Sequence, residues 1–492
     1  MPLFPPARAH PHLYEINTWP WLESLSRRAE QRLTLDRVPD AEWSRLRDVG
    51  IDLVYLMGVW RRSALGRQIA RGEPALFAAY DAAAPTWQAR DIVGSAFCLS
   101  AYEPDERMGG WAGLDAARAA LHARGMRLIV DFIPNHVGFD HPWVAQHPDW
   151  FVSGDEEAFR QSPAAFRPIE LRNGDVRFIA CGRDPFFPPW TDVAQLNHFN
   201  PEMRSALVDE LRRVAEHADG ARCDMAMLLL SDAFERTWTG CHVGPRPATE
   251  FWADALAAVP DRLFVAEAYW DLEWRLQQLG FNFTYDKRLY DRLLHGSPDD
   301  VWAHLRADGD YQRKSARFIE NHDEPRSAVA FGARAGAAAV VMSTLPGLRF
   351  FYDGQFEGRR IHAPVQLGVI GDEPIDLLVS EQYRRLLAIV DAPPFHAGEW
   401  RLCDVSGGDT ARDLVAWRWR DGAAWRLVVV NLGTAAAEGF VDVSDAPLTG
   451  DDVVFDDLLS GARYDWARQD LARGLYVRLE KGASHILSLP SS

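Results

Sequence analysis

The sequence predicts an α/β protein built on a (β/α)8 barrel, also called a TIM barrel. Short apolar runs typical of strands alternate with helical patterns over most of the 492 residues, which indicates a parallel sheet. Eight such runs are present, each followed by room for a helix, and a barrel of this kind needs eight. The runs cover residues 12–17, 51–57, 127–133, 220–225, 263–268, 281–285, 316–321 and 348–352.

The helices between these strands are clearest over residues 111–124 and 201–217. The second opens with Asn200 and Pro201, a favoured N-cap residue followed by the proline favoured at the first helical position. Two intervals are too long for simple loops, namely residues 60–110 after the second strand and 137–196 after the third. The second interval is rich in Pro, Phe and Trp and is expected to form a small inserted domain.

After about Pro393 the pattern changes to β-strands separated by turns, which predicts a C-terminal antiparallel β-sandwich. The strands are expected at residues 414–419, 425–431, 439–443 and 475–479. The predicted domains are a barrel domain in two parts, residues 1–136 and 196–393, an inserted domain over 137–195, and a C-terminal β domain over 394–492.

Charge and composition exclude several classes of protein. With 70 acidic and 53 basic residues the net charge is −17, which argues against binding to nucleic acid or to an anionic membrane surface. No apolar stretch approaches the roughly 18 residues of a membrane span, and the start of the chain has no apolar signal-peptide core. The five cysteines include no CxxC pair and predict neither a disulfide framework nor a zinc site. A cytoplasmic protein with a neutral substrate is expected, and no oligomeric state is indicated.

Polar clusters follow four of the predicted strands, at the face where a barrel carries its active site. In one cluster Arg222 and Asp224 are two residues apart, so both point to the same side of their strand. A neighbouring guanidinium keeps a carboxylate ionised, as covalent glycosyl transfer requires. A structural ion pair explains this pair alone equally well. The clusters are DFIPNH at 131–136, GARCD at 220–224, VAE at 265–267 and NHD at 321–323.

Two further carboxylates complete the predicted chemistry. Glu267 follows an apolar run, and partial burial there raises the pKa of a carboxyl group so that it can donate a proton and later accept one. A Glu that caps a strand end is the simpler alternative. Asp323 is placed to bind sugar hydroxyls and to adjust the ionisation of its neighbours. Retaining glycosidases hold two carboxyls roughly 5 Å apart, and adjacent strands would bring Asp224 and Glu267 close together.

Taken in order, the four clusters resemble the four main signatures of the α-amylase family of glycoside hydrolases (family 13). Softer similarities lie at 50–59, 195–197 and 345–355. The resemblance implies a barrel with an inserted domain and a C-terminal β domain. By position, Asp224 matches the nucleophile, Glu267 the general acid/base and Asp323 the transition-state stabiliser. The predicted substrate-binding and supporting positions are Asp131, His136, Arg222 and His322, with Asn135 beside them.

Two departures from the family pattern bear on function. A tyrosine that stacks on the sugar is replaced in the stretch Gly94-Ser95-Ala96-Phe97, so stacking is expected to come from elsewhere. A histidine that binds calcium in many members is replaced by Leu228, after Met227, and an apolar side chain cannot be a calcium ligand. No metal or other cofactor is therefore predicted, although Asn135 keeps calcium open. The tryptophans expected at the pocket rim are Trp60, Trp143, Trp190 and Trp270.

Three functional hypotheses follow. The first is a retaining α-glycosidase that acts on α-linked glucose oligosaccharides through a covalent glycosyl-enzyme intermediate. The second is an α-glucan transglycosylase or sugar isomerase with the same carboxylates. Its glycosyl-phosphate variant draws on a similarity of residues 94–97, 140–143 and 147–151 to maltosyltransferases that use maltose 1-phosphate, and Arg61, Arg62 or Arg67 would bind the phosphate. The third, a non-catalytic carbohydrate-binding protein, fits least well because all three carboxylates are present.

Overall fold

A computed structural model describes residues 8–489 of the chain, so the outer ends of the first and last predicted domains (1–7 and 490–492) lie outside the described residues. In the described part, eight parallel strands close into a barrel in the order β1-β15-β14-β13-β12-β11-β5-β2. The eight predicted strands are confirmed, although β14 ends before the predicted Asn321. Their bounds are β1 His12–Asn17, β2 Leu53–Met57, β5 Arg127–Phe132, β11 Gly220–Cys223, β12 Leu263–Ala266, β13 Phe283–Tyr285, β14 Ser315–Arg317 and β15 Leu348–Tyr352.

The barrel strands are almost entirely buried, because helices cover them outside and side chains fill the interior. Of the two helices expected most clearly, α5 runs over Gly110–His122 and α8 over Pro201–His217. The predicted cap is confirmed, since the Asn200 side chain accepts hydrogen bonds from the amides of Glu202 and Met203. The other barrel helices include α1 Thr18–Arg28, α2 Asp40–Asp48, α10 Phe251–Ala258, α11 Glu273–Gln278, α12 Lys287–His295, α13 Pro298–Leu305, α15 Ser327–Ala330, α16 Ala335–Thr344 and α17 Leu377–Val390.

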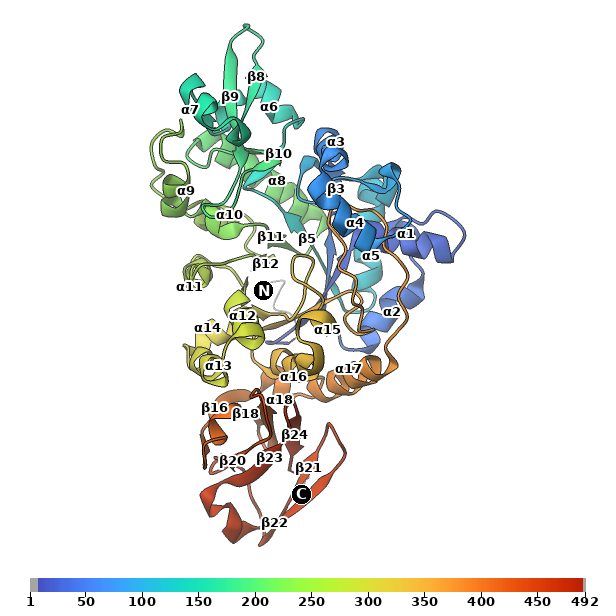
Figure 1. Cartoon of the computed structure of the whole chain (residues 1–492), viewed down its shortest axis with the longest axis vertical. Helices are drawn as coiled ribbons and strands as arrows, with labels where there is room; N and C mark the ends of the chain where they lie inside the picture. The colour runs from blue at the N-terminus through green and yellow to red at the C-terminus, as the bar shows by residue number, and fades with distance from the viewer. Residues whose placement is uncertain (1–7, 490–492) are drawn as a thin grey trace.

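The long connection after β2 is folded. It contains β3 (Trp60–Arg62) paired with β4 (Leu99–Pro104), and between them the helices α3 (Ala64–Gly72) and α4 (Phe77–Ala83). Tyr80, Ile92 and Leu367 are buried in a small core of their own, and Ile92 forms a β-bridge with Leu367. This connection therefore lies against the segment that follows β15, beside the carboxyl end of the barrel (Figure 1).

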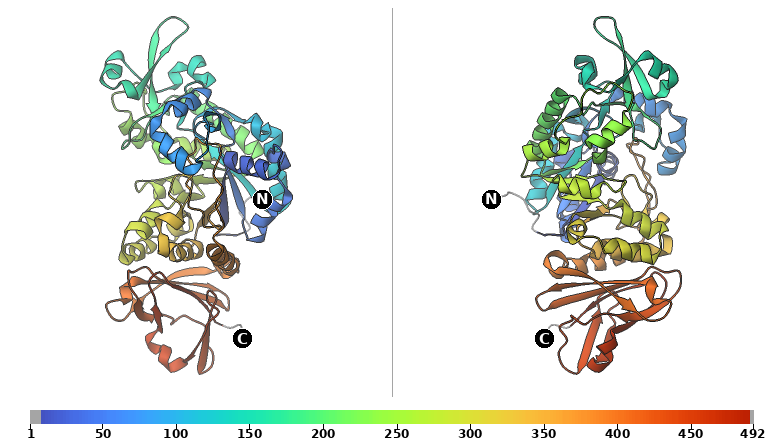
Figure 2. Two further views of the ribbon diagram at one scale, coloured as in Figure 1. Left: turned by 45° about the vertical axis from the view of Figure 1, so that its right-hand side comes forward. Right: turned by 90° about the vertical axis from the view of Figure 1, so that its left-hand side faces the viewer.

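The segment after β5 forms a separate sheet with the order β6-β10-β9-β7, and β8 pairs with β9. The β8–β9 hairpin projects at the end of the molecule farthest from the C-terminal sheets in both Figures 1 and 2. Strand β10 returns the chain to the barrel, because Gln195 pairs with His136 at the exit of β5. The bounds are β6 His136–Gly138, β7 Ser153–Gly154, β8 Phe166–Glu170, β9 Val176–Gly182 and β10 Trp190–Gln195.

The C-terminal region consists of two antiparallel sheets, β16-β18-β19-β24-β21-β22 and β17-β20-β23, which pack around a shared apolar core. They lie below the barrel in Figure 2 and are fixed to it by Trp417 and Trp419, whose indole N–H groups donate to the Thr344 carbonyl of α16. The bounds are β16 Glu399–Cys403, β17 Val405–Ser406, β18 Leu414–Asp421, β19 Ala424–Asn431, β20 Ala437–Val441, β21 Asp452–Asp457, β22 Arg463–Ala467, β23 Leu475–Leu479 and β24 Ser484–Ser488.

A bilayer-spanning helix, one both long and apolar enough, does not occur between residues 8 and 489.

Candidate active site

The predicted catalytic residues follow directly from the ends of neighbouring barrel strands. Asp224 comes after β11 and its amide donates to the Phe132 carbonyl of β5 at 2.8 Å. Glu267 comes after β12 and its amide donates to the Cys223 carbonyl of β11 at 3.0 Å. These bonds continue the sheet ladder beyond the assigned strands, so rigid backbone rather than a loose loop positions both carboxylates.

Arg222 joins the two carboxylates. Its Nη1 donates to Asp224 Oδ1 at 2.6 Å, and its Nη2 lies 3.0 Å from Glu267 Oε2. Its Nε donates to the Tyr285 hydroxyl at 3.3 Å, and the side chain is 1% exposed. A buried guanidinium is stable only when its donors are satisfied, and here each branch has a partner. Asp224 and Glu267 therefore lie side by side on one cation.

Glu267 has further donors. The amide of Met225 donates to Oε2 at 2.6 Å, and the Tyr269 hydroxyl donates to Oε1 at 2.8 Å. Met225 has a φ of 44°, a left-handed conformation that costs a non-glycine residue about 1–3 kcal/mol and is concentrated at functional sites. The strain aims this amide at the carboxyl group.

Burial raises the pKa of both carboxyls, and the charge of Arg222 opposes it in both. Burial raises the pKa of Glu267 to about 7, against the opposing charge of Arg222 and with help from the nearby Asp224 and Asp323. Burial also raises the pKa of Asp224, but the charge and hydrogen bond of Arg222 both favour its anion. Near neutral pH, Glu267 is thus a carboxyl that can carry a proton, while the Arg222 guanidinium favours the anion of Asp224.

His322 links a third carboxylate to the barrel wall. Its Nδ1 is 2.5 Å from Glu15 Oε1, and its Nε2 is 3.1 Å from Asp323 Oδ2. Burial opposes the charged ring, yet the two carboxylates raise the pKa of His322 well above its usual value. Desolvation opposes ionisation of Asp323 although its side chain is 47% exposed, and the imidazolium lowers the pKa of Asp323 to about 2. Sequence reasoning missed Glu15, whose signal is a glutamate in the middle of the apolar strand β1.

A cavity of about 510 Å³ opens over these residues. Four of the seven predicted site residues line it: Asp224, Glu267, Asp323 and His136. Its cover comes from outside the barrel, from the end of α3 and from β10. The remaining lining residues are Ile69, Ala70, Glu73, Leu76, Ser95, Phe97, Pro189, Trp190, Thr191, Asp192, Val193, Met225 and Gln366.

Asp131, Arg222 and His322 lie behind the cavity, so the structure does not place them in contact with a substrate there. Asp131 lies within β5 instead of beyond its end and is fully buried. Its carboxylate accepts hydrogen bonds from the Tyr55 hydroxyl and from the Gly58 amide. For Asp131 the geometry corresponds to the supporting position that the resemblance implied.

His136 lines the cavity as a neutral ring. Burial lowers the pKa of His136 to about 4. Its Nε2 lies 3.1 Å from the Phe97 carbonyl, which can only accept, so Nε2 carries the hydrogen. Nδ1 then accepts from the Asn135 amide at 3.2 Å. Both ring nitrogens are occupied, and His136 offers the cavity its ring rather than a free donor.

The stretch at 94–97, where the family tyrosine is replaced, still supplies an aromatic ring to the cavity. Phe97 lines the cavity, stacks on His322 with ring centroids 5.1 Å apart, and faces the guanidinium carbon of Arg222 at 5.2 Å. The aromatic ring of this stretch belongs to Phe97, three residues after Gly94. The backbone at Gly94 is left-handed, with a φ of 87°.

Of the four tryptophans expected at the rim, Trp190 lines the cavity. Trp270 follows Glu267 closely in the sequence but is not among the lining residues, and the centroid of its ring is 4.9 Å from that of the exposed Phe186. The prediction for Trp60 is wrong, since this residue is fully buried and donates to the Asp131 carbonyl. Trp143 packs on Trp150 and does not line the cavity.

The residues at the family's calcium position do not fit a calcium ion. Leu228 is 3% exposed and packed in the core. The Asn135 side-chain oxygen accepts from the Gln195 amide at 3.0 Å, so a neutral donor engages one of its two lone pairs. Within residues 8–489, acidic, histidine and cysteine side chains form no group of three or more suited to a metal.

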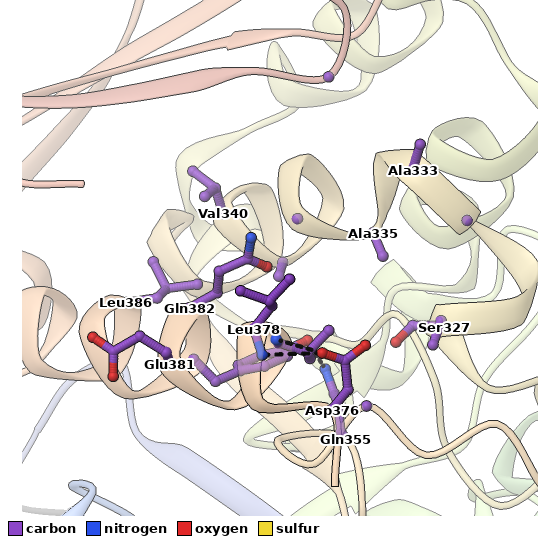
Figure 3. A pocket seen from close by; sticks show the side chains of 18 of the residues that line it. Ser327, Ala333, Ala335, Val340, Gln355, Asp376, Leu378, Glu381, Gln382 and Leu386 are labelled. Carbon is purple, nitrogen blue, oxygen red and sulfur yellow. Dashed lines mark hydrogen bonds between the residues drawn. The ribbon is translucent and has the colours of Figure 1, made fainter. Parts of the chain in front are cut away.

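A second cavity, of about 730 Å³, lies between α15, α16 and α17 and reaches the C-terminal sheets (Figure 3). Asp376 faces it, but its carboxylate caps α17 by accepting from the amides of Leu378 and Val379. Eight of its 23 lining residues are alanine or glycine, and the described residues lining it include no member of the carboxylate cluster. The chemistry therefore belongs to the first cavity.

The barrel, the inserted sheet and the carboxylate cluster at the carboxyl end define a protein of the glycoside hydrolase class. The family model described as "Alpha amylase, catalytic domain" matches residues 101–365, more than half of the chain. The chain belongs to this family.

Among its relatives, "Alpha-amylase 3" of Dictyoglomus thermophilum is 21% identical over 285 residues, which are 54% of this chain and 51% of that protein. The "Alpha-1,4-glucan:maltose-1-phosphate maltosyltransferase" of Burkholderia pseudomallei is 27% identical over 289 residues, 54% of this chain and 20% of that protein. The chain thus spans about half the length, or less, of these curated relatives. The structure of a noncanonic maltogenic alpha-amylase, AmyB, from Thermotoga neapolitana shares the fold, with a TM-score of 0.69, 19% identity and 98% coverage of both chains.

Proposed function

We propose that this protein is a retaining α-glycosidase that acts on short α-linked glucose oligosaccharides. The observation that carries the proposal is the sharing of one buried guanidinium by Asp224 and Glu267, with the proton favoured on Glu267. This is the pairing that covalent catalysis needs, since one carboxylate must attack the sugar while the other protonates the leaving oxygen.

In the proposed reaction, Asp224 attacks the anomeric carbon as the glycosidic C–O bond breaks and the Glu267 proton moves to the leaving oxygen. A water molecule then attacks the glycosyl–Asp224 ester, and Glu267 takes its proton. Asp323, held anionic by His322, stabilises the positive charge that develops on the sugar. Phe97 provides an apolar face for the ring.

The second candidate is an α-glucan transglycosylase or sugar isomerase, and the cover over the cavity favours it. Helix α3 and strand β10 close two sides of the cavity, which would keep water from the intermediate while a sugar acceptor attacks. The maltosyltransferase relative shows that proteins similar to this chain include a glycosyl transferase by name.

The charge of the cavity argues against a glycosyl-phosphate donor. The described lining residues include Glu73 and Asp192 besides the three central carboxylates, but no Lys or Arg. Arg61 is paired with Glu103, and the buried Arg62 donates to the carbonyls of Gly94 and Val365. Carboxylates without a free cation repel a phosphate. We propose a neutral sugar substrate and a cytoplasmic location.

The test is incubation with maltose, maltotriose, maltotetraose, trehalose, sucrose and isomaltose, each with and without phosphate, followed by chromatography of all products. Shorter sugars alone support hydrolysis and identify the linkage. Longer or rearranged glycosides support the second candidate instead. Activity that depends on phosphate would contradict the neutral donor, and no turnover of any of these sugars would contradict the α-glucoside substrate.

A further inference from the structure

We propose that Tyr269 is a positioning residue that binds Oε1, the proton-carrying atom of Glu267, and favours the anionic form of this carboxyl group. The inference rests on the proposed function, in which Glu267 is the general acid/base. It begins from an asymmetry between the two oxygens of the Glu267 carboxyl, which bind different sets of donors.

The oxygen Oε2 has no room for a proton. It accepts from the Met225 amide at 2.6 Å and lies 3.0 Å from Arg222 Nη2. Both partners are donors that cannot turn into acceptors, because one is a backbone N–H and the other a guanidinium. A proton on Oε2 would point at one of these N–H groups, so the protonated form of Glu267 carries its hydrogen on Oε1.

The oxygen Oε1 has a different partner. Within the described residues its hydrogen bond comes from the Tyr269 hydroxyl, at 2.8 Å. One donor leaves a second lone pair on Oε1, and Glu267 lines the cavity, so that lone pair can hold the proton that a substrate oxygen receives. Tyr269 is held by the chain itself, two residues after Glu267, and packs against the core.

The Tyr269 hydroxyl also changes the pH at which Glu267 loses its proton. A phenol O–H donates more strongly to a carboxylate than to the hydroxyl of a neutral carboxylic acid, so the bond favours the anion. It acts against the burial that raises the pKa of Glu267. The other ionisable groups that face Glu267 are Arg222 and Asp224 of the β11 segment, Asp323 after β14, His136 on β6 and Tyr285 on β13. The proposal predicts that Glu267 holds its proton to higher pH when the Tyr269 hydroxyl is removed.

The experiment compares Tyr269→Phe with Tyr476→Phe. Tyr476 donates to Glu438 at the same 2.8 Å distance, but on the C-terminal sheet, so it is a matched tyrosine–glutamate pair outside the site. The carboxyl carbon of Glu267 is titrated by NMR of protein labelled with ¹³C-glutamate, and its signal is assigned by its loss in Glu267→Gln. We expect Tyr269→Phe to move this titration, and the alkaline limb of kcat/KM, up by about one pH unit, with no shift in Tyr476→Phe. For α-glucosyl fluoride, whose leaving group needs no proton, kcat/KM should change by less than about two-fold.

An unmoved or lowered titration of Glu267 in folded Tyr269→Phe would overturn the proposal. The NMR titration needs no substrate, so it remains readable even when no α-glucoside is turned over, and a failure of the proposed function is thereby distinguished from a failure of this inference. If Tyr269→Phe does not fold, 3-fluorotyrosine at position 269 replaces it. Its hydroxyl is a stronger donor, so the titration of Glu267 must move down, and an unchanged titration contradicts the role of Tyr269.

Discussion

The two ends of the barrel both bury an arginine, but they surround it with opposite chemistry. At the carboxyl end, Arg222 binds Asp224 and Glu267. At the amino end, Arg349 donates to the Phe395 carbonyl and to the neutral His12 ring, and the rings of His12 and His396 are 5.2 Å apart. Burial and then Arg349 lower the pKa of both His10 and His396 to about 3.

The difference separates a reactive site from a structural one. The carboxyl groups beside Arg222 differ in how readily they ionise, and they line a cavity in which they can act on a substrate. Neutral histidines beside Arg349 avoid cation–cation repulsion and hold the barrel against the C-terminal region, as His10 shows by its ring contact with Trp419. Strongly shifted pKa values alone therefore do not identify an active site. A cavity of about 500 Å³ also lies at the amino end, where His10 lines it. What distinguishes the carboxyl end is that carboxylates bound to a shared arginine line its cavity.

The largest difference is expected from removing one carboxylate at each end. Asp224→Asn removes the nucleophile and should lower kcat about 10⁴-fold or more, as losses of catalytic nucleophiles do. At the other end, Asp52→Ala removes the acceptor for the His12 amide and should lower the melting temperature while kcat stays within about two-fold. Steady-state kinetics and thermal unfolding of both variants give the comparison. Retained activity in Asp224→Asn would remove Asp224 from the mechanism.

Replacing the two arginines should give the same contrast between activity and stability, with a smaller loss of activity than in Asp224→Asn. Arg222→Met leaves both carboxylates without their shared cation, so we expect kcat/KM to fall about 10²–10³-fold. Arg349→Met should leave kcat unchanged and lower stability, because the Phe395 carbonyl loses its donor. Loss of activity in Arg349→Met, measured well below its melting temperature, would break the distinction between the two ends.

Acid should weaken the amino end first. Since the folded-state pKa of His10 and His396 lies near 3 and the unfolded value is 6.5, the unfolded chain binds more protons between these values. Stability is therefore complete above pH 6.5 and falls as the pH decreases toward 3. In His396→Asn the slope of the unfolding free energy over this range should be reduced by up to about 1.4 kcal/mol per pH unit. Denaturant unfolding from pH 7 to 4 measures it, and an unchanged slope would show that His396 is not neutral in the folded protein.

The carboxyl end should limit activity from the alkaline side. Because the pKa of Glu267 is raised from 4.5 to about 7 in the folded protein, kcat/KM should fall as the pH rises through 7. The free energy of unfolding should also fall as the pH rises from about 4.5 to 7, where the folded chain holds a proton that the unfolded chain has lost. A pH–rate profile with parallel melting curves is the check. An alkaline limb that persists unchanged in Glu267→Gln would assign it to another group.

The smallest effect is expected from chelation. At the calcium position Leu228 is apolar and the Asn135 oxygen accepts a hydrogen bond from Gln195. EDTA followed by excess Ca²⁺ should therefore change activity by less than about two-fold and the melting temperature by less than about two degrees. A melting temperature that drops with EDTA and returns with calcium, but not with magnesium, would show that a calcium site exists.

The sequence predicted the barrel well because buried parallel strands are continuous apolar runs, and it found Asp224, Glu267 and Asp323 because motifs follow those strands. It could not predict contacts between distant segments. Phe97 reaches His322 across more than two hundred residues, and Glu15 does so from the first strand. Asp131 lies inside the predicted strand at 127–133, but its contacts with Tyr55 and Gly58 join distant segments and could not be predicted from the sequence.

The proposed mechanism requires that Asp224 form a covalent bond to the sugar at the carboxyl end of the barrel. The direct test is reaction with 5-fluoro-α-D-glucosyl fluoride, rapid quenching, digestion and peptide mass spectrometry. The account predicts a fluoroglucosyl adduct on the peptide that contains Asp224, and no such adduct in Asp224→Asn. An adduct on a different carboxylate, or turnover of the reagent to the inverted sugar without any adduct, would contradict it.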